Sequence, residues 1–266
     1  MLEAERHRII LKLLQERSII SVSDLVEILG ASDATVRRDV NALAEAGKIR
    51  RIRGGAESIH PRHEAHLVGT PFALNRDLGV PQKRAIARAA AALIEDSDSL
   101  IINAGTSTLA LTEFLAGRQL DILTNSVPII ARLHVSSRNR VSIPGGTVFR
   151  EQNIVISPFA DDTVESFWAQ KLFTGCYGIN RHGVMEADPL IVQAQARLLK
   201  RTEQVIVLAD SSKLRQRSPI IVMPLEKVSV LITDDGAREA ELEELRAAGI
   251  KIIIAPTTAA DKQQVA

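Results

Sequence analysis

Apolar residues recur at helical spacing over residues 3–47, with two short interruptions. One stripe predicts a helix over residues 3–16, with charged residues on its other faces. Residues 19–22 are apolar enough for a short strand, and Ser23 can cap a second helix that Gly30 ends. The start of the chain is therefore predicted to be a small, mostly helical domain.

A third helix is predicted to begin at Ser32 or Asp33 and to end at Gly47. Its inward face carries Val36, Val40, Leu43 and Ala44, and its outward face carries Thr35, Arg38 and Asn41. Two helices joined by a tight turn are typical of a helix-turn-helix, whose second helix enters the major groove of DNA. Arg and Asn can pair bidentately with guanine and adenine edges, and Thr can contact a phosphate or a thymine methyl. We therefore interpret this helix as a DNA recognition helix.

Residues 48–57 alternate apolar and glycine residues with arginines, which predicts a basic hairpin that would grip phosphates as a wing. The chain has 33 Lys and Arg against 32 Asp and Glu, a net charge of +1, so only this local concentration of charge points to nucleic acid. A solvated basic face on a small helical domain is the alternative. The number of helices, the cap, the turn and the wing all favour a DNA-binding domain instead. The predicted DNA-binding residues are Ser32, Thr35, Arg37, Arg38, Asn41, Arg51 and Arg53.

Residues 58–80 show no sustained period and contain Pro and Gly, which predicts a linker. His60, His63 and His66 fall in this stretch. We interpret them as solvated linker side chains rather than ligands, and we expect no metal.

Beyond the linker, helical and strand patterns alternate to about residue 256. Helices are predicted near 82–94 and 161–168, and a strand over 172–177. This order predicts a Rossmann-like, mostly parallel α/β domain with helices on both faces and ligand chemistry at the carboxyl ends of its strands. The expected organisation is a winged helix-turn-helix (1–57), a linker (58–80), an α/β sensor domain (81–256) and a disordered tail (257–266).

Composition narrows the class of protein. Of the 266 residues, 45% are hydrophobic and 3% aromatic, which suits a core of aliphatic side chains in an α/β domain. Cys176 is the one cysteine, so an internal disulfide and a cysteine-based zinc site are excluded. The chain begins without the pattern of a secretory signal and contains no apolar run of membrane-spanning length. We expect a cytoplasmic protein with no membrane partner.

Four polar clusters follow predicted strands. The first, residues 103–108, lies between a strand and a helix, where free amides and hydroxyls can hold a phosphate. Thr124-Asn125 and Gly145-Gly146 would each pass for an ordinary turn. Residues 210–213 offer a carboxylate for sugar hydroxyls and an ammonium for an anion, although a capped turn would explain them too. Four clusters at successive strand ends favour a shared ligand site.

Several motifs of the N-terminal part together strongly resemble the DNA-binding domain of DeoR-family transcriptional regulators. They are Val22-Ser23-Asp24-Leu25, the run from Ser32 to Val40, and Arg51-Ile52-Arg53-Gly54-Gly55-Ala56. The resemblance implies that Arg37 and Arg38 lie at the DNA surface. It also implies that Asp39 holds an arginine or caps a neighbour.

The strand-end clusters resemble the effector domain of the same family, which is similar in fold to ribose-5-phosphate isomerase and the sugar-phosphate deaminases. In that family these clusters surround a phosphorylated sugar or related metabolite. The implied effector-binding residues are Asn103, Gly105, Thr106, Ser107, Thr108, Asn125, Gly145, Gly146, Asp188, Asp210 and Lys213. No cofactor is implied.

One segment departs from the family pattern. Many members place a Glu-Ala pair and then a Lys shortly after an aspartate, whereas here Asp188-Pro189 is followed by Leu190-Ile191-Val192, with Arg197 in place of the lysine. This difference suggests an atypical effector, nearer to a sugar-acid or opine-type phosphate than to a simple hexose phosphate.

The leading hypothesis is a transcriptional repressor of a carbohydrate-catabolism operon. It would bind double-stranded operator DNA as a homodimer or homotetramer and would be relieved by a phosphorylated sugar-like effector. The alternative is a sugar-phosphate isomerase or deaminase with an appended DNA-binding module. Asp161, Asp162, Glu165 and Asp210 are carboxylates available for such catalysis, but they form no recognisable catalytic constellation. We therefore expect no enzymatic activity. Activation in place of repression is open.

Overall fold

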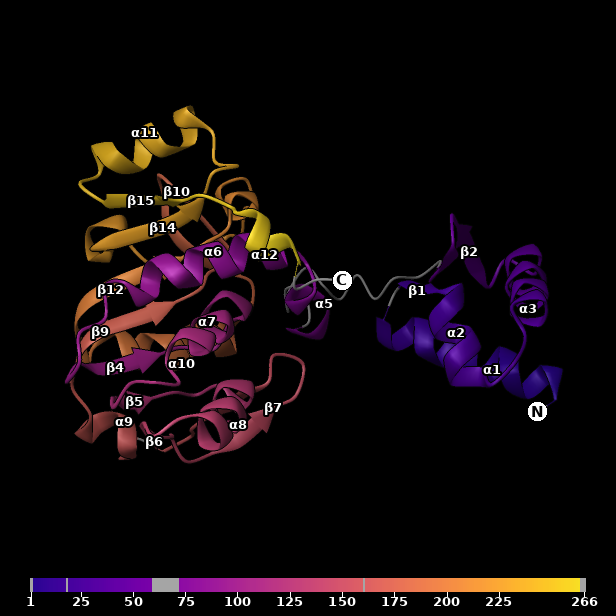
Figure 1. Cartoon of the computed structure of the whole chain (residues 1–266), viewed down its shortest axis with the longest axis horizontal. Coiled ribbons are helices and arrows are strands. Elements are labelled where there is room, and N and C mark those ends of the chain that lie inside the picture. Colours follow the sequence, from indigo (N-terminus) through magenta and orange to yellow (C-terminus); the bar gives the residue numbers. More distant parts are fainter. Residues whose placement is uncertain (1, 18, 59–71, 160, 264–266) are drawn as a thin grey trace. The chain divides into compact units, whose positions relative to one another are not determined.

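The chain forms two compact units, residues 1–66 and 67–266 (Figure 1). The computed structural model describes residues 2–17, 19–58, 72–159 and 161–263. His60, His63 and His66, and most of the expected linker, lie outside these residues.

The first unit is a winged helix-turn-helix. Its helices are α1 (Glu3–Arg17), α2 (Val22–Leu29) and α3 (Asp33–Glu45), and its strands are β1 (Ile19–Ser21), β2 (Ile49–Ile52) and β3 (Gly55–Ser58). The strands form an antiparallel sheet in the order β1-β3-β2. A Cβ on Gly55 would come within 2.3 Å of the Ile20 carbonyl oxygen, so β1 and β3 approach this closely only because residue 55 is glycine.

The three helices of this unit bury one apolar core. Fully or almost fully buried side chains include Ile10 of α1, Leu25 of α2, and Val36 and Val40 of α3. Gly30 adopts the left-handed conformation that ends α2. The expected cap of α2 was wrong by two positions, because the hydroxyl of Ser21, not Ser23, accepts the hydrogen bond from the Asp24 amide.

The second unit is built on a seven-stranded sheet in which every pair of neighbouring strands is parallel. Its order is β15-β14-β12-β9-β4-β5-β6. The strands are β4 (Ser99–Ile102), β5 (Asp121–Leu123), β6 (Arg140–Ser142), β9 (Ala169–Thr174), β12 (Thr202–Leu208), β14 (Val230–Asp234) and β15 (Lys251–Ala255). From β4 the chain first adds β5 and β6 on one side, then returns to place β9 and the later strands on the other. The topological switch point therefore lies between β4 and β9.

Successive side chains of the central strands enter two different cores. In β4, Leu100 and Ile102 pack on one face of the sheet, and Ile101 packs on the other. Helices α6 (Val80–Ala91), α7 (Thr106–Leu111) and α8 (Val127–Ser136) cover the first face. Helices α10 (Pro189–Leu199) and α11 (Glu239–Ala247) contribute to the core on the second face (Figure 1).

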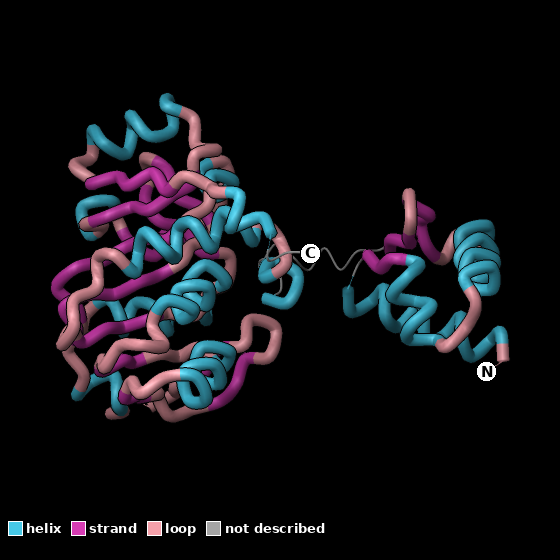
Figure 2. The backbone as a smooth tube through the Cα atoms, viewed as in Figure 1, coloured by secondary structure: helices cyan, strands magenta, loops and turns pink. Residues whose placement is uncertain are grey.

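The remaining elements are short (Figure 2). A three-stranded antiparallel sheet contains β10 (Gly178–Asn180), β11 (Gly183–Glu186) and β13 (Ile220–Met223), and a hairpin contains β7 (Thr147–Phe149) and β8 (Ile154–Ile156). The short helices are α5 (Phe72–Arg76), α9 (Thr163–Ser166) and α12 (Ala259–Gln263), with 3₁₀ turns η1 (Thr112–Phe114), η2 (Ser211–Leu214) and η3 (Leu225–Lys227).

Several boundaries differ from the sequence-based expectations. The strand expected over 172–177 is β9, which begins earlier and ends at Thr174, and the helix expected over 161–168 is the single turn α9. Residues 72–76, expected in the linker, form α5. The expectation of a disordered tail was wrong for residues 259–263, which form α12 and bury Asp261 completely.

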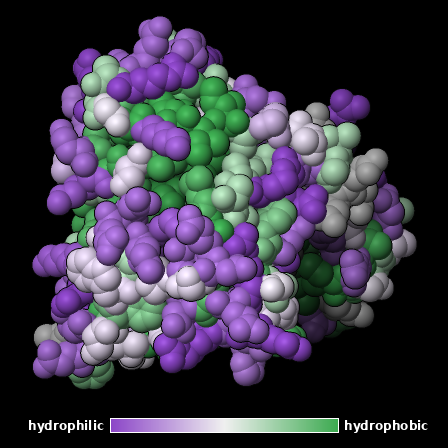
Figure 3. Space-filling view, turned by 60° about the vertical axis from the view of Figure 1, so that its left-hand side comes forward, coloured by the Kyte–Doolittle hydropathy of each residue, from purple (hydrophilic) through white to green (hydrophobic). Residues whose placement is uncertain are grey.

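The surface of the larger unit is not uniformly polar. The space-filling view shows a broad apolar area in its upper part, bordered by hydrophilic side chains (Figure 3). Exposed large apolar residues of this unit include Val135, Trp168 and Ile254. Across the described ranges, no helix has both the length and the apolar character needed to cross a membrane.

Candidate functional site

The recognition helix α3 is held in place by a cap and by an ion pair. The Ser32 hydroxyl accepts the Thr35 amide at 3.3 Å and lies 2.8 Å from the Thr35 hydroxyl. Arg6 of α1 binds the buried carboxylate of Asp39, with Nε 2.6 Å from Oδ2. The prediction that Asp39 holds an arginine is therefore confirmed.

The outer face of α3 and the wing present polar and basic side chains together. Arg37, Asn41, Arg51 and Arg53 line one hollow between α3 and the β2–β3 hairpin. Arg38 is exposed on α3, while Arg37 pairs with Asp33 one turn earlier. Arg50 faces Glu57 across the hairpin, 3.2 Å away, whereas Arg51 is exposed opposite Ala56 and Arg53 is exposed in the turn after β2. This surface combines hydrogen-bonding side chains for base edges with cations for phosphates.

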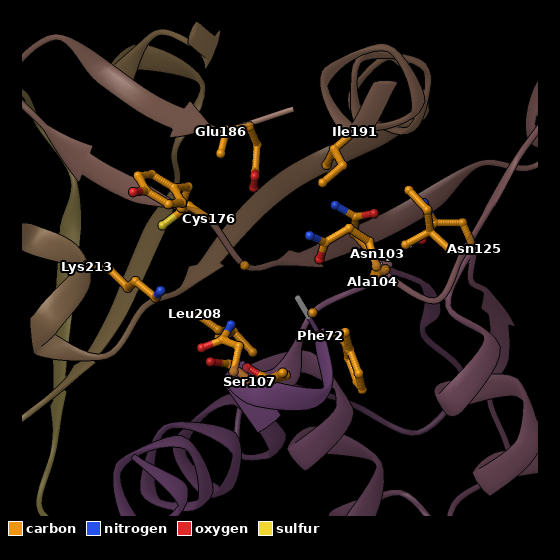
Figure 4. A pocket seen from close by; sticks show the side chains of 18 residues that line it. Phe72, Asn103, Ala104, Ser107, Asn125, Cys176, Glu186, Ile191, Leu208 and Lys213 are labelled. Carbon is orange, nitrogen blue, oxygen red and sulfur yellow. Dashed lines mark hydrogen bonds between the residues drawn. The ribbon is translucent and has the colours of Figure 1, made fainter. Parts of the chain in front are cut away.

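The larger unit contains a cavity at the carboxyl ends of its strands, beside the switch point between β4 and β9 (Figure 4). We call it the strand-end cavity. Six of the predicted effector residues line it: Asn103, Gly105, Thr106, Ser107, Asn125 and Lys213. Residues that were not predicted also line it, among them Phe72, Asn75, Gln152, Cys176, Tyr177, Glu186 and Ile191.

Hydrogen bonds fix the loops around the strand-end cavity. The Ala104 amide donates to Asn125 Oδ1 at 2.9 Å, which ties the loop after β4 to the loop after β5. Asn103 Nδ2 donates to the Thr174 hydroxyl at 3.0 Å, and the buried Gln195 donates to the same oxygen at 2.8 Å. The amides in the first turn of α7 have no acceptor within that helix, so they can face a ligand.

Lys213 supplies a cation at one end of the strand-end cavity. Its Nζ lies 3.2 Å from Gln216 Oε1 and 5.9 Å from the centre of the Tyr177 ring. A second lysine, Lys83 of α6, lies buried behind the wall, where its Nζ donates to the carbonyls of Asn75 and Leu78. Burial lowers the pKa of Lys83 to about 8.

Cys176 and Glu186 face the same space. Burial raises the pKa of the Cys176 thiol, so this group is neutral and a poor nucleophile at physiological pH. Burial also raises the pKa of Glu186, to about 7, against smaller opposing effects of the Ala187 amide and of Lys213.

The other predicted effector residues do not line the strand-end cavity, and most of them have a local role in the fold. Asp188 caps α10 through the Leu190 amide at 2.7 Å, and Asp210 caps η2 through the Ser212 amide at 3.1 Å. Thr108 is buried and donates to the Gly105 carbonyl. Gly145 and Gly146 form the turn before β7, where a Cβ on Gly146 would come within 2.1 Å of the Ile156 carbonyl oxygen. Asp-Pro and Asp-Ser pairs at helix starts are ordinary capping patterns, which explains why two of these residues resembled ligand groups.

The sequence contains a signal for some of the cavity-lining residues that were not predicted. Cys176 and Tyr177 follow β9 just as Asn103 follows β4, so the rule that sites lie at strand carboxyl ends also applies to them. Glu186 ends a strand of the separate antiparallel sheet, and no local pattern marks it.

Comparison with known families decides the assignment. Residues 79–235 match the family model of the DeoR C terminal sensor domain, and residues 6–62 match that of the DeoR-like helix-turn-helix domain. The chain belongs to the DeoR family. It is a DNA-binding transcriptional regulator of this family, with an N-terminal helix-turn-helix and a C-terminal sensor domain.

Similar proteins carry the same description. The HTH-type transcriptional regulator UlaR from Shigella dysenteriae serotype 1 (strain Sd197) is 32% identical over 253 residues, which cover 95% of this chain and 99% of the relative. UlaR from Escherichia coli O1:K1 / APEC matches with the same identity and coverage. These relatives are named as regulators, and no finding favours the enzyme alternative.

Solved structures are more distant. Ribose 5-phosphate isomerase A from Methanocaldococcus jannaschii matches with a TM-score of 0.37 and 11% identity over 49% of this chain and 52% of the other. The full-length sorbitol operon regulator SorC from Klebsiella pneumoniae matches with a TM-score of 0.34 and 12% identity, covering 97% of this chain and 98% of that one. Both scores are too low to carry a conclusion about this DeoR-family chain.

Proposed function

We propose that this DeoR-family regulator is a repressor of a carbohydrate-catabolism operon, and that a phosphorylated sugar or sugar derivative bound in the strand-end cavity releases it from operator DNA. The observation that supports this most directly is the meeting of Ser107, Asn125 and Lys213 around one cavity beside the switch point. Amides and hydroxyls of the 103–107 loop suit a phosphate, Lys213 suits its charge, and amide side chains suit sugar hydroxyls.

The proposed DNA-binding residues are those of the α3 and wing surface, namely Ser32, Thr35, Arg37, Arg38, Asn41, Arg51 and Arg53. Operator DNA is the macromolecular partner, and we place the protein in the cytoplasm, where bacterial operators are found. We propose that it acts as a homodimer or homotetramer, because paired recognition helices reach successive major grooves of a repeated site. Apolar area of the kind seen in Figure 3 is common where subunits associate.

Release of DNA requires that the effector bind two arrangements of the protein with different affinity. Helix α5 offers a route for that difference. It is the first described element after the inter-unit segment, and its Phe72 and Asn75 line the strand-end cavity. A ligand that reorders these side chains changes the interactions of the helix nearest the segment that leads to the DNA-binding unit.

The departure from the family pattern bears on the identity of the effector. Arg197 does not line the strand-end cavity, because its guanidinium binds Asp162 at 2.8 Å. Ile191 does line it, so the segment after Asp188 contributes an apolar contact there. An effector with a less hydroxylated portion than a hexose phosphate is consistent with this lining.

Titration of operator binding tests the proposed function. Operator DNA is selected from the region upstream of the gene, and binding is followed by fluorescence anisotropy with glucose 6-phosphate, ribose 5-phosphate and 6-phosphogluconate. We expect at least one of them to weaken DNA binding by about tenfold or more, within the usual range of allosteric coupling. Lys213→Ala should abolish this response while leaving DNA affinity in its absence unchanged, and Lys227→Ala, an exposed lysine, is the matched control. A sugar phosphate that binds the protein without altering DNA affinity would refute the coupling.

A further inference from the structure

The carboxyl group of Glu186 shares the strand-end cavity with the groups suited to an anion. Figure 4 shows its carboxylate directed into the cavity from the side of the small antiparallel sheet, whereas Ser107 enters from the opposite side and Lys213 from a third. A carboxylate and a phosphate in one cavity repel each other, and the repulsion is strong because little water separates them. The function of Glu186 in an anion-binding cavity therefore needs an explanation.

The surroundings of Glu186 favour its neutral form. Cys176 and Ile191 line the same part of the cavity, where a thiol is only a weak donor and an aliphatic side chain donates nothing. Burial raises the pKa of Glu186 more than the amides of Ala187 and Tyr177 lower it. The neighbouring strands, β10 and β13, contain no titratable side chain. The charged groups that affect Glu186 are Lys213, which favours the carboxylate, and Asp188, which opposes it.

The position of Glu186 is fixed by its backbone. It ends β11, and its carbonyl accepts the Ser218 hydroxyl at 2.6 Å, which ties it to the segment that leads into β13. This bond holds the backbone of Glu186, from which the side chain directs its carboxyl group into the cavity (Figure 4). A protonated carboxyl group there can donate a hydrogen bond to an oxygen of the ligand.

We propose that Glu186 is a specificity-determining residue of the sensor domain, which in its neutral form donates a hydrogen bond to an oxygen at the non-phosphate end of the ligand and which excludes an anionic ligand when ionised. This inference rests on the proposed function of the cavity. Its consequence is that effector affinity depends on pH near neutrality, so that a fall in cytoplasmic pH strengthens effector binding and weakens repression.

The pKa of Glu186, about 7, sets the size of the effect. If only the neutral form admits the ligand, its share falls about tenfold between about pH 6 and about pH 8, and affinity falls with it. The second ionisation of the phosphate, near pH 6, acts in the opposite direction by roughly twofold over this range. Wild-type affinity should therefore fall about fivefold.

Calorimetric titration of the full chain with glucose 6-phosphate, 6-phosphogluconate and inorganic phosphate at both pH values tests this. Glu186→Gln keeps a neutral hydrogen-bonding group, so it should bind the sugar phosphates at about pH 8 at least as tightly as wild type does at about pH 6. Glu186→Ala should lose about tenfold affinity for the sugar phosphates at about pH 6. It should bind inorganic phosphate as wild type does at that pH, because inorganic phosphate lacks the sugar portion that Glu186 would contact. Glu226→Gln, which removes an exposed carboxylate, should retain the wild-type pH profile.

The outcomes separate the two proposals. Glu186→Gln with the wild-type pH profile, or Glu186→Ala with unchanged preference for sugar phosphates over phosphate, overturns the role of Glu186 alone. Failure of the wild type to bind any of the three probes at either pH overturns the proposed function together with this inference. Circular dichroism of each variant checks that it is folded, and Glu186→Gln, nearly equal in volume to glutamate, keeps the test valid if Glu186→Ala unfolds.

Discussion

Arg6 holds Asp39 with two parallel hydrogen bonds, 2.6 Å from Nε to Oδ2 and 3.0 Å from Nη2 to Oδ1. Arg6 belongs to α1 and Asp39 to the recognition helix α3, so the pair ties these two helices together beside their shared apolar core. Asp39 is thus buried with a partner inside the smaller unit and does not lie on the exposed face of α3.

Asp39→Asn should destabilise the smaller unit, because the amide cannot accept both of the bonds that Arg6 donates and lacks the negative charge that strengthens them. We expect the unfolding midpoint of this unit to fall by roughly 5 °C, a shift typical of a modest loss in so small a domain. Differential scanning calorimetry measures it, and Asp24→Asn, an exposed carboxylate on α2, is the control. An unchanged midpoint would show that the pair contributes nothing to stability.

The same pair makes stability depend on acid. The hydrogen bond from Arg6 lowers the pKa of Asp39 and outweighs the opposing effect of burial. A carboxylate with a lowered folded pKa stabilises fully above its unfolded value of about 3.9, and its contribution is lost as the pH falls through the folded value. As the pH falls through the folded pKa of Asp39, the free energy of unfolding of the smaller unit should decrease in the wild type. It should decrease less in Asp39→Asn.

Arg38→Ala should weaken operator binding by about tenfold at physiological salt, the cost of one arginine contact to a base or phosphate. Arg38 is exposed on the outer face of α3, whereas its neighbour Arg37 pairs with Asp33. Fluorescence anisotropy with operator DNA measures the loss, and Arg138→Ala on the sensor domain is the control. Equal affinity of wild type and Arg38→Ala would remove Arg38 from the DNA-binding surface.

Asp261→Asn should destabilise the sensor domain by about 1–3 kcal/mol, the usual cost of leaving buried hydrogen-bonding groups without partners. Asp261 is fully buried and accepts bonds from Arg88 at 2.6 Å and from the Thr258 hydroxyl at 2.7 Å. Burial would raise the pKa of Asp261, but the bonds from Arg88 and Thr258 outweigh it and hold the pKa below its ordinary value. Urea unfolding monitored by circular dichroism measures the change, and Asp96→Asn, an exposed carboxylate, should change little. Matching curves for Asp261→Asn and wild type would show that α12 does not stabilise the domain.

Gly146→Ala should destabilise the sensor domain by about 1–3 kcal/mol, because residue 146 has a φ of +141° and an added Cβ would collide with the Ile156 carbonyl. Gly145→Ala is the matched control, since a Cβ there meets nothing within 4 Å. Both variants should bind sugar phosphates as wild type does while folded, because neither glycine lines the strand-end cavity. If Gly146→Ala instead kept its stability and lost the ligand, the turn before β7 would belong to the binding site.

The DNA-binding unit was largely predictable because its signals are local. The apolar stripe and the outward polar face lie within the 13 residues of α3, and the cap, Ser32, directly precedes them. The resemblance of the neighbouring segments to the DeoR family points to the same structure. The displaced cap at Ser21 shows where local signals fail, since Ser21 and Ser23 have similar capping chemistry and the backbone path decides between them.

The strand-end cavity was only partly predictable because its walls come from distant segments. Loops that directly follow parallel strands were found, since such strands end at one edge of a sheet. Glu186 was not found, because it reaches the cavity from a separate antiparallel sheet. Helix α12 was not predicted for a similar reason, since Arg88, which binds Asp261 of this helix, lies 173 residues earlier in the chain.

Helix α5 both begins the described part of the sensor domain and contributes to the wall of the strand-end cavity. The polypeptide that arrives from the DNA-binding unit becomes, within its first described turn, part of the wall of the strand-end cavity through Phe72 and Asn75, and Lys83 binds the carbonyls of Asn75 and Leu78 from behind. The start of the sensor domain is thus part of the cavity in which we propose that the effector binds. Under this proposal, coupling of effector binding to DNA binding needs no long path through the sheet. Mutations that alter the coupling should then lie in α5 and leave the hydrophobic cores unchanged.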